Sequence, residues 1–531
     1  MTSVVDIEVF NGIFTSIAEE MGIILARSAF SSNMKERRDF SCALFDREGE
    51  MIAQAAHIPV HLGSLAATLA HIRRNFTLAP GDIAISNDPY GGGSHLPDIT
   101  LVEGVFAEDG ELLFHVLNRA HHADVGGASP GSMGLASSIA AEGVRIEPSL
   151  LQRAGRPDQL FLQSFLARVR NPEERLGDLR AQQAALTRGK KRLLDLAARH
   201  GHARLREISA GLQDYSERVM RATIRTVPDG CYRFTDHLDD GGAGAAQPLA
   251  ISVELTIQGE EALVDFRQSA PQVASPVNTV ASVTGSATIY VFQCLAGNTF
   301  PINSGSSRPL RILTRPGTLL DAVFPAPVAA GNVETSQRIV DVLMGALAQA
   351  IPERIGAASC GSMNNIAIGG IRRDGRPYTY YETIGGGMGG RPSSAGLSGI
   401  HTHMTNTMNT PVEALEHSYP FLVTRYGLRL GSGGRGRNPG GDGIVRSYRF
   451  LEPAELSLLT DRRRFPPYGL AGGGPGKKGV NILERQGKKK RMPGKVSIET
   501  RPGDILHIST PGGGGWGRPD RDSGGPRQAD S

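Results

Sequence analysis

Metal-capable side chains are concentrated between residues 39 and 124 of this chain. The motif HLPD (95–98) follows a glycine loop, and HHAD (121–124) follows an expected strand at 114–120. Histidine and aspartate together suit a divalent ion of borderline hardness, such as Zn²⁺, Mn²⁺ or Fe²⁺. Pro97 cannot occupy a helix interior, so the two ends of HLPD must converge through a turn if they share an ion. On spacing alone, two polar loops with exposed histidines are the more ordinary explanation.

Other motifs with known chemistry fail on their context. GSGGRG (431–436) and GGGMGG (385–390) both fit G-x-G-x-x-G, but neither opens a helix whose N-terminus could receive a pyrophosphate. GASPG (127–131) fits G-x-S-x-G, but Pro130 has no N–H to serve as an oxyanion donor. Neither a Walker A motif nor H-E-x-x-H occurs in the sequence. The chain therefore shows no recognisable nucleotide-binding site of its own.

The composition is that of a large globular protein. The chain has 531 residues, enough for several packed domains, with 40% apolar and 21% charged residues. Its 67 glycines indicate many tight turns and close backbone approaches. The formal net charge is only +4, and the basic residues gather at 462–464, 477–478 and 488–491 without interleaved aromatic residues. We therefore expect these runs to be solvated faces, and we expect no nucleic-acid partner.

Cysteine usage and hydropathy bear on the compartment. The four cysteines, Cys42, Cys231, Cys294 and Cys360, include no C-x-x-C pair, so neither a disulfide framework nor a zinc knuckle is indicated. The first residues, MTSVVDIEVF, lack the basic and apolar segments of a signal peptide. No apolar run is expected to approach the length of a membrane span. These features predict a cytoplasmic protein that does not act at a membrane.

The hydrophobic pattern predicts an α+β fold, a glycine-rich, strand-dominated body of several units with an inserted long helical hairpin. Helices are expected at 5–28, 63–75, 279–295 and 335–350. Strands are expected at 37–46, 50–60, 82–86, 98–106, 112–118, 231–238, 249–257 and 262–267. The resulting units are a metal-site region (1–157), the helical hairpin (158–226), a central α/β region (227–440), a C-terminal β-rich region (441–517) and a disordered tail (518–531).

Several long segments resemble the hydantoinase B/oxoprolinase family. That family contains the B subunits of ATP-dependent hydantoinases, the C-terminal half of 5-oxoprolinases, lactamase subunits and one subunit of acetone-type carboxylases. The resemblance spans about residues 4–519 and rests on ERRDFSCALFD (36–46), HIPVHLGS (57–64), NDPYGGGSHLPDIT (87–100), RAHHADVGGASPGSMG (119–134), EGVRI (142–146), GGGMGGRP (385–392), NTPVEALE (409–416), GSGGRGRNPGGDG (431–443) and TPGGGGWGRP (510–519).

The resemblance implies a set of site residues. A divalent metal would be held by Asp39, His95, Asp98 and His121. Because the position after this histidine varies among relatives, His121 is favoured over His122. Asp124 is implied as a catalytic-site carboxylate that partners a ligating histidine.

Asp39 enters this set through the resemblance alone. The sequence offers no independent signal for it, and an ion pair with Arg37 or Arg38 is its more ordinary role.

The resemblance also implies a function. The chain would be the metal-bearing subunit of an ATP-dependent amidohydrolase that opens a hydantoin, 5-oxoproline or lactam ring. A hydantoinase A-type partner of actin-like fold would use ATP and Mg²⁺ to phosphorylate the amide oxygen, and the metal in this chain would activate the attacking water. The two subunits would form heterodimers that dimerise.

Two alternatives remain open at the level of sequence. One is a subunit of an acetone-type, ATP-dependent carboxylase, although the segments specific to those longer proteins find no match here. The other is a non-catalytic scaffold that stabilises the ATP-binding partner.

Overall fold

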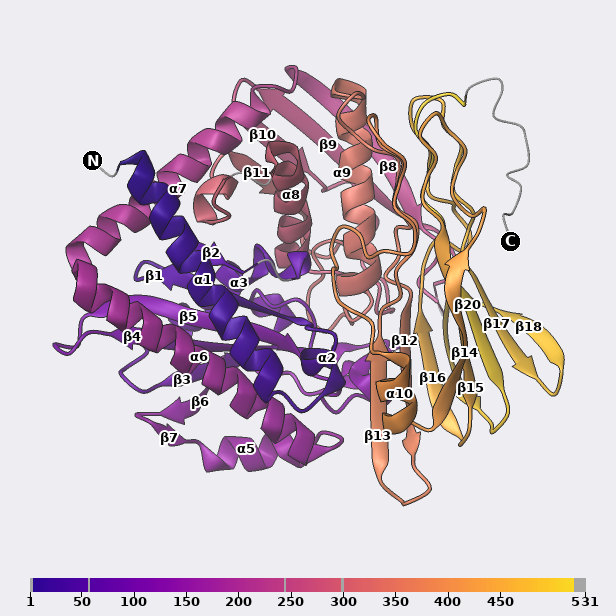
Figure 1. Ribbon diagram of the computed structural model, residues 1–531, viewed down its shortest axis with the longest axis horizontal. Helices are drawn as coiled ribbons and strands as arrows, with labels where there is room; N and C mark the ends of the chain where they lie inside the picture. Colours follow the sequence, from indigo (N-terminus) through magenta and orange to yellow (C-terminus); the bar gives the residue numbers. More distant parts are fainter. Residues whose placement is uncertain (1–2, 56–57, 243–244, 298–299, 520–531) are drawn as a thin grey trace.

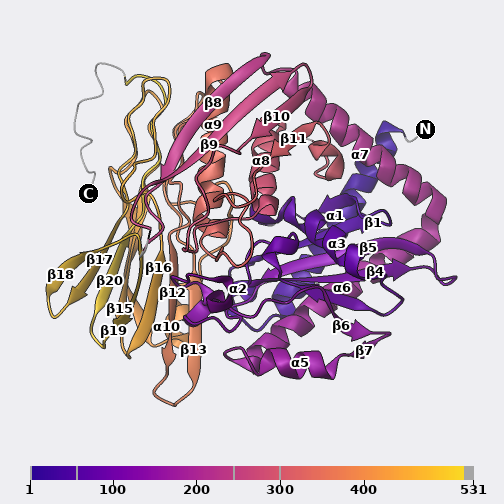
Figure 2. The same cartoon turned by 180° about the vertical axis from the view of Figure 1, so that it is seen from behind.

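The computed structural model describes residues 3–55, 58–242, 245–297 and 300–519. These residues form four β-sheets combined with helices, which confirms the expected mixed α+β class (Figure 1). The first two sheets and the long helices lie on one side of the molecule, and the last two sheets stand against them (Figures 1 and 2). Most of the expected tail, from residue 520 onward, lies outside the described residues.

The first sheet carries the candidate site. Its seven antiparallel strands have the order β2-β1-β5-β4-β3-β6-β7. Their bounds are β1 (Phe40–Asp46), β2 (Met51–Gln54), β3 (Ile83–Ser86), β4 (Asp98–Phe106), β5 (Leu112–His121), β6 (Ser149–Arg153) and β7 (Arg156–Pro157). The strand expected over 50–60 is shorter in the structure, because a 3-10 turn, Pro59–His61, follows β2.

Both faces of this sheet are covered, which explains the unbroken apolar character of β1. Cys42 and Leu44 join a core cluster with α1 (Val4–Ser28) on one face. Ala43 and Phe45 pack with α3 (Ser64–Asn75) on the other. Successive side chains of a strand point to opposite faces, so a strand between two helical layers needs apolar residues at every position.

The helical region follows the first sheet in the chain. It contains α5 (Gln159–Leu166), α6 (Pro172–His200) and α7 (His202–Ile224), so the expected long helices are present. Helices α6 and α7 diverge at Gly201 as an open V (Figures 1 and 2). Helix α6 packs along α1 and against β4 and β5, whereas α7 packs mainly against a turn at Ser304–Ser307 and also against α1 and α8 (Ala281–Ala296). The helices therefore pack mainly against the rest of the fold and less against each other.

Helix α1 is long and apolar enough, by length and composition alone, to cross a membrane. The expectation that no apolar run approaches that length is therefore wrong for this segment. Its side chains Phe10, Phe14, Ile17 and Met21 are buried in the main hydrophobic cluster. A helix buried in a protein core passes the same test, so a membrane location is not indicated.

The second sheet and its helices form the middle of the chain. The sheet has the order β11-β10-β9-β8, and only β10 and β11 are parallel. Its strands are β8 (Gly230–Leu238), β9 (Leu249–Gln258), β10 (Glu261–Asp265) and β11 (Leu310–Leu313). Helix α9 (Ser336–Ala350) packs on β8 and β9 and is preceded by a π-helical turn, Gly331–Thr335.

The last two sheets cross the boundary expected at residue 440. The third sheet has the order β13-β12-β16-β19 and the fourth β14-β15-β20-β17-β18. Their strands are β12 (Asn365–Ile371), β13 (Pro377–Glu382), β14 (Phe421–Arg429), β15 (Gly443–Phe450), β16 (Ala454–Leu459), β17 (Val480–Arg485), β18 (Lys488–Met492), β19 (Lys495–Thr500) and β20 (Ile505–Ser509); α10 (Val412–Ser418) precedes β14. Because β12 pairs with β16 and β14 with β15, no structural break lies at 440.

The glycine-rich motifs of this part hold backbone against backbone. A Cβ at Gly387 would lie 1.9 Å from the carbonyl oxygen of Gly441, and one at Gly513 would lie 2.0 Å from that of Met388. Gly513 N donates to Gly441 O at 3.0 Å, and Gly441 N donates to Met388 O at 2.8 Å. Side chains larger than hydrogen would force these segments apart, so the motifs have a structural reason independent of any nucleotide.

The basic runs divide into two kinds. Arg462 and Arg463 are buried, and Arg462 forms ion pairs with Asp236 and Asp341 at 2.9 and 2.5 Å. The expectation of a solvated face is wrong for these two arginines, because their partners lie far away in sequence. Lys488, by contrast, begins four exposed basic residues on the edge strand β18, where positive charge discourages pairing with a further strand.

Candidate metal centre

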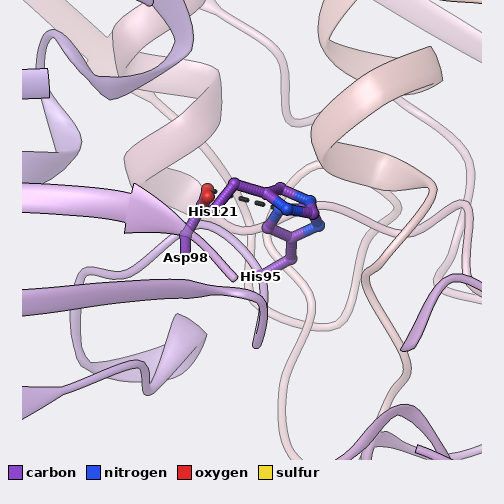
Figure 3. Close-up of side chains that lie close together, drawn as sticks. All are labelled: His95, Asp98 and His121. Carbon is purple, nitrogen blue, oxygen red and sulfur yellow. Dashed lines mark ion pairs between the residues drawn. The ribbon is translucent and has the colours of Figure 1, made fainter. Parts of the chain in front are cut away.

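Three of the four expected ligands converge in the structure. One ligand atom from each of His95, Asp98 and His121 lies within 4.8 Å of the others, and all three residues are buried (Figure 3). His95 Nε2 lies 3.3 Å from Asp98 Oδ2. The convergence results from strand pairing and one turn. Asp98 begins β4 and stands directly opposite His121 at the end of β5, so their side chains share a face of the sheet.

The turn before β4 brings in His95. Asp98 N donates to the carbonyl of His95 at 3.1 Å, and Asn87 Nδ2 donates to the carbonyl of Leu96 at 2.8 Å. Ser94 Oγ donates to Asp98 Oδ2 at 2.5 Å. HLPD therefore converges through a turn, as Pro97 requires.

Both histidines are anchored through Nδ1. The carbonyl of Ala329 lies 3.3 Å from His95 Nδ1, and because a carbonyl only accepts, that nitrogen carries the proton. Asn33 Nδ2 lies 3.1 Å from His121 Nδ1, while Asn33 Oδ1 is buried without a partner. Turning the Asn33 amide over would give its oxygen the Nδ1 proton of His121. In that arrangement the Nε2 atoms of both rings are left free for a ligand.

The unpartnered polar atoms gather at this point. His95 Nε2, His121 Nε2 and Asp98 Oδ1 are all buried and make no hydrogen bond among the described residues, although His95 Nε2 has the ion-pair contact with Asp98 Oδ2 at 3.3 Å. Buried polar groups in native proteins are nearly always satisfied, so three such atoms in one place need an explanation. Two imidazole nitrogens and a carboxylate oxygen are donors that Zn²⁺, Mn²⁺ and Fe²⁺ accept, and the site fits such an ion.

Burial and neighbouring charges shift the pKa values of His121, His95 and Asp98 in different ways. Burial, reinforced by His95, holds the pKa of His121 well below its usual value, so this ring is neutral at neutral pH. Burial alone would lower the pKa of His95, but Asp98 raises it. Burial would likewise raise the pKa of Asp98, yet His95 and His61 hold it well below its ordinary value. Asp98 is therefore a carboxylate whose charge the two histidines stabilise.

Asp39, the fourth expected ligand, borders the same cavity. This cavity of about 20 Å³ is lined by Asp39, Ile58, Val60, His61, Asp98, His121, Asn332, Val333, Met363, Tyr381, Thr383, Met404 and Thr405. Its volume is close to what one small ion or water needs. Asp39 Oδ2 also lies 3.3 Å from Arg37 Nη2. Burial raises the pKa of Asp39, although Arg37 opposes the shift. Asp39 therefore forms the ion pair with Arg37 and borders the cavity at the same time.

His61 is a residue of the site that the sequence interpretation did not select. Its Nε2 lies 3.1 Å from Asp98 Oδ2, and its Nδ1 lies 2.8 Å from Ser41 Oγ. With both ring nitrogens engaged, His61 holds Asp98 through Oδ2 and leaves Oδ1 without a hydrogen bond. The sequence did offer one signal for His61: it lies in the segment HIPVHLGS, between residues 39 and 124, where metal-capable side chains are concentrated.

His122 and Asp124 point away from the cluster. His122 Nε2 hydrogen-bonds to Gln182 Oε1 of α6 at 2.9 Å. The carboxylate of Asp124 accepts from the backbone N–H groups of Gly126, Gly131 and Arg170 at 2.9, 3.1 and 3.1 Å. It also accepts from the Arg170 side chain at 2.9 Å. The expectation that Asp124 partners a ligating histidine is therefore wrong, because Ala329 and Asn33 take that place.

The sequence matches the hydantoinase B/oxoprolinase family over residues 3–519. The chain belongs to this family. It is 41% identical to an uncharacterised protein of Methanocaldococcus jannaschii, over 97% of this chain and 91% of that protein. It is 38% identical to 5-oxoprolinase 1 of Arabidopsis thaliana over 97% of this chain, but spans only 42% of that enzyme's length. A Pseudomonas protein provisionally named as the B subunit of a D-/L-hydantoinase is 32% identical, with 97% and 90% coverage.

Two solved structures share the fold. The ATP-dependent caprolactamase of Pseudomonas jessenii superposes with a TM-score of 0.90 and 30% identity, covering 97% of this chain and 91% of that one. A nucleotide-free acetone carboxylase superposes with a TM-score of 0.89, covering 96% of this chain and 75% of that one. The identity to the carboxylase is 17%, so this second likeness concerns the fold alone.

Proposed function

We propose that this chain is the metal-bearing subunit of an ATP-dependent enzyme that hydrolyses small cyclic amides of the hydantoin, 5-oxoproline or lactam class. Membership of the family and the likeness to a caprolactamase support the reaction class. The observation that carries the proposal is the set of atoms without a hydrogen bond on His95, Asp98 and His121, which are buried together; Asp98 and His121 also line one small cavity.

Some residues of the site would bind the metal ion, and others would shield it from bulk water. His95 and His121 would offer Nε2, Asp98 would offer Oδ1, and Asp39 would supply a further negative charge. A divalent ion held there would lower the pKa of a water and polarise the electrophile. The apolar wall, which includes Val60, Val333, Met363 and Met404, limits the access of bulk water and so strengthens the charge interactions inside the cavity.

ATP chemistry would belong to another polypeptide. The sequence has no recognisable phosphate-binding loop, and the chain spans less than half of the plant 5-oxoprolinase that it matches. We therefore assign ATP and Mg²⁺ to a hydantoinase A-type partner, in a hetero-oligomer of dimerised heterodimers. Phosphorylation of the amide oxygen there would turn a poor acyl group into a reactive one. Because this step consumes ATP, the proposed location is the cytoplasm.

The experiment is to co-express the chain with its A-type partner and purify the complex. Bound metals are measured by mass spectrometry, and ATP-dependent ring opening is assayed on hydantoin, 5-oxoproline and a lactam. We expect about one equivalent of a divalent metal per chain, and activity that a chelator abolishes. Product formation that requires bicarbonate would identify a carboxylase instead. Full activity of the partner alone, with no metal in this chain, would identify a scaffold.

A further inference from the structure

Glu142 is a buried carboxylate outside the proposed ligand set. It ends the short helix α4 (Ile139–Glu142), within the segment EGVRI, and is 2% exposed. Its Oε2 accepts from the N–H of Val328 at 3.0 Å, and its Oε1 accepts from the N–H of Ala329 at 2.9 Å. The carboxylate thus grips two consecutive peptide groups that lie far away in sequence.

The two N–H groups bound by Glu142 belong to the turn that leads into the π-helical segment Gly331–Thr335. The carbonyls of Val328 and Ala330 accept backbone bonds from inside this segment, at 3.1 Å from Gly331 N and 2.7 Å from Glu334 N. The carbonyl between them, that of Ala329, is the one that meets His95 Nδ1. The turn has little room to shift, because a Cβ at Gly331 would lie 1.7 Å from the carbonyl oxygen of Asn278. The direction of the Ala329 carbonyl is therefore fixed from both ends of the turn.

No basic side chain among the described residues forms an ion pair with Glu142. Burial raises its pKa to about 7, although the N–H groups of Val328 and Ala329 oppose the shift, as a protonated His95 also would. A buried carboxylate without a counter-ion is costly, so a fold that needed only two backbone contacts would gain by using a neutral side chain. A cation held at His95 would supply the missing positive charge.

We propose that Glu142 is a positioning residue of the metal centre: it holds the Val328–Ala329 turn so that the Ala329 carbonyl keeps the proton of His95 on Nδ1 and leaves Nε2 for the metal. This inference rests on the proposed metal-binding function. It assigns a role to EGVRI that neither the ligand set nor the strand pairing explains. The carboxylate acts through backbone and carbonyl and does not itself touch the metal or the substrate.

The test replaces Glu142 by glutamine in the full chain. A glutamine oxygen accepts one of the two N–H bonds, and its NH₂ group opposes the other. The matched control is Asp82→Asn, since Asp82 is also buried and accepts from two backbone N–H groups, those of Ala79 and Ala154, at 3.1 and 2.8 Å. Two quantities are measured: the tautomer of neutral His95 in metal-free protein by ¹⁵N NMR, at a pH above the raised pKa of this ring, and the affinity for Zn²⁺ by competition with a chelator.

In wild type we expect the Nδ1–H form of His95. Glu142→Gln should mix the two tautomers and weaken Zn²⁺ binding by about 10- to 100-fold, the usual cost of losing an outer partner of a metal ligand. Asp82→Asn should lower the melting temperature without changing either quantity. Glu142→Asp keeps the negative charge on a shorter side chain, so its tautomer ratio and its Zn²⁺ affinity should lie between those of wild type and Glu142→Gln. If Glu142→Gln does not fold, Glu142→Asp takes its place.

If the Glu142 variant that folds lowered the melting temperature as the Asp82 variant does, yet left tautomer and affinity at their wild-type values, Glu142 would be purely structural and the inference overturned. Wild-type protein that bound no Zn²⁺ would contradict the proposed function instead. The tautomer measurement would then still decide the role of Glu142.

Discussion

The ring of Tyr381 lies flat against the ring of His121, with 4.6 Å between centroids and 4° between planes. Tyr381 comes from β13 of the third sheet and His121 from β5 of the first. The Tyr381 hydroxyl donates to Asn365 Oδ1 at 2.6 Å, and Arg37 lies 4.9 Å from the centroid of the same ring. The orientation of one proposed ligand therefore depends on how the C-terminal sheets dock against the N-terminal one.

Replacing Tyr381 separates the stack from the hydrogen bond. Tyr381→Phe keeps the ring and should bind Zn²⁺ as wild type does, while losing about 1 kcal/mol of stability because Asn365 Oδ1 loses its donor. Tyr381→Leu removes the flat surface that holds His121, and we expect about tenfold weaker Zn²⁺ binding. Chelator competition and urea unfolding measure the two effects. Equal Zn²⁺ affinities of the two variants would show that the stack does not orient His121.

The neighbouring histidines offer a paired comparison. His95→Ala and His121→Ala should each remove most of the bound metal and abolish ring opening in the complex with the partner. His122→Ala should retain metal, because its Nε2 is engaged with Gln182. Metal content by mass spectrometry, with circular dichroism as a check of folding, decides the comparison. Loss of metal from the His122 variant but not from the His121 variant would reverse the assignment.

Local patterns in the sequence predicted much of the fold. The strands that carry the site, near 98–106 and 112–118, were visible as apolar runs, and Pro97 required the turn that brings His95 to Asp98. Pairing between β4 and β5 then follows from their adjacency in the chain. The candidate residues at this hairpin could therefore be selected before the structure, although the choice of His121 over His122 came from the family resemblance.

The partners of those residues could not be predicted, because they come from distant segments. Asn33, Ala329 and Tyr381 meet the two histidines only after several sheets and helices have packed together. Their residue types carry no chemical signal, and the contact made by Ala329 uses its backbone. Asp124 has the opposite character, since its type and position suggested a role at the site while its contacts lie within its own loop and with Arg170.

The variant Asp124→Asn tests whether Asp124 stabilises its own loop and takes no part in metal binding. The carboxylate satisfies three backbone N–H groups and the side chain of Arg170, so an amide at this position leaves at least one of them poorly paired. We expect a loss of about 1–3 kcal/mol in unfolding free energy and no change in Zn²⁺ affinity. Urea unfolding and chelator competition measure the two. A loss of metal without a loss of stability would return Asp124 to the site.

Protonation of Asp461 at low pH is expected to weaken the contact between α9 and the third sheet. Asp461 is fully buried and accepts from Lys495 at 2.8 Å and from Arg338 at 3.0 Å. Burial alone would raise its pKa, but Lys495 and Arg338 lower it to about 2. A depressed carboxylate contributes stability above its unfolded pKa and loses it as the pH falls through the folded value. This contribution, about 2 kcal/mol, should therefore be present above about pH 4 and lost towards pH 2.

The variant Asp461→Asn isolates this group from the other carboxylates. At pH 7 it should be less stable by about 3–5 kcal/mol, because the buried Lys495 and Arg338 each lose their nearest anionic partner. The difference in unfolding free energy between wild type and variant, measured by urea unfolding, should shrink between about pH 4 and pH 2. A difference that stays constant over that range would mean that Asp461 does not change its protonation there.

Asp39 faces both Arg37 and the cavity, and its replacement distinguishes the two roles. A metal with fewer anionic ligands is held more weakly, so Asp39→Ala should lower Zn²⁺ affinity while leaving both histidines in place. Excess Zn²⁺ should then restore part of the ring-opening activity of the complex. Asp39→Asn, which keeps an oxygen for Arg37, controls for the lost ion pair, and it should also bind Zn²⁺ weakly. If saturating Zn²⁺ restored nothing in a folded variant, Asp39 would act on the substrate and not on the metal. If affinity and turnover were both unchanged, the ion pair with Arg37 would be its whole role, and the ligand set would reduce to His95, Asp98 and His121.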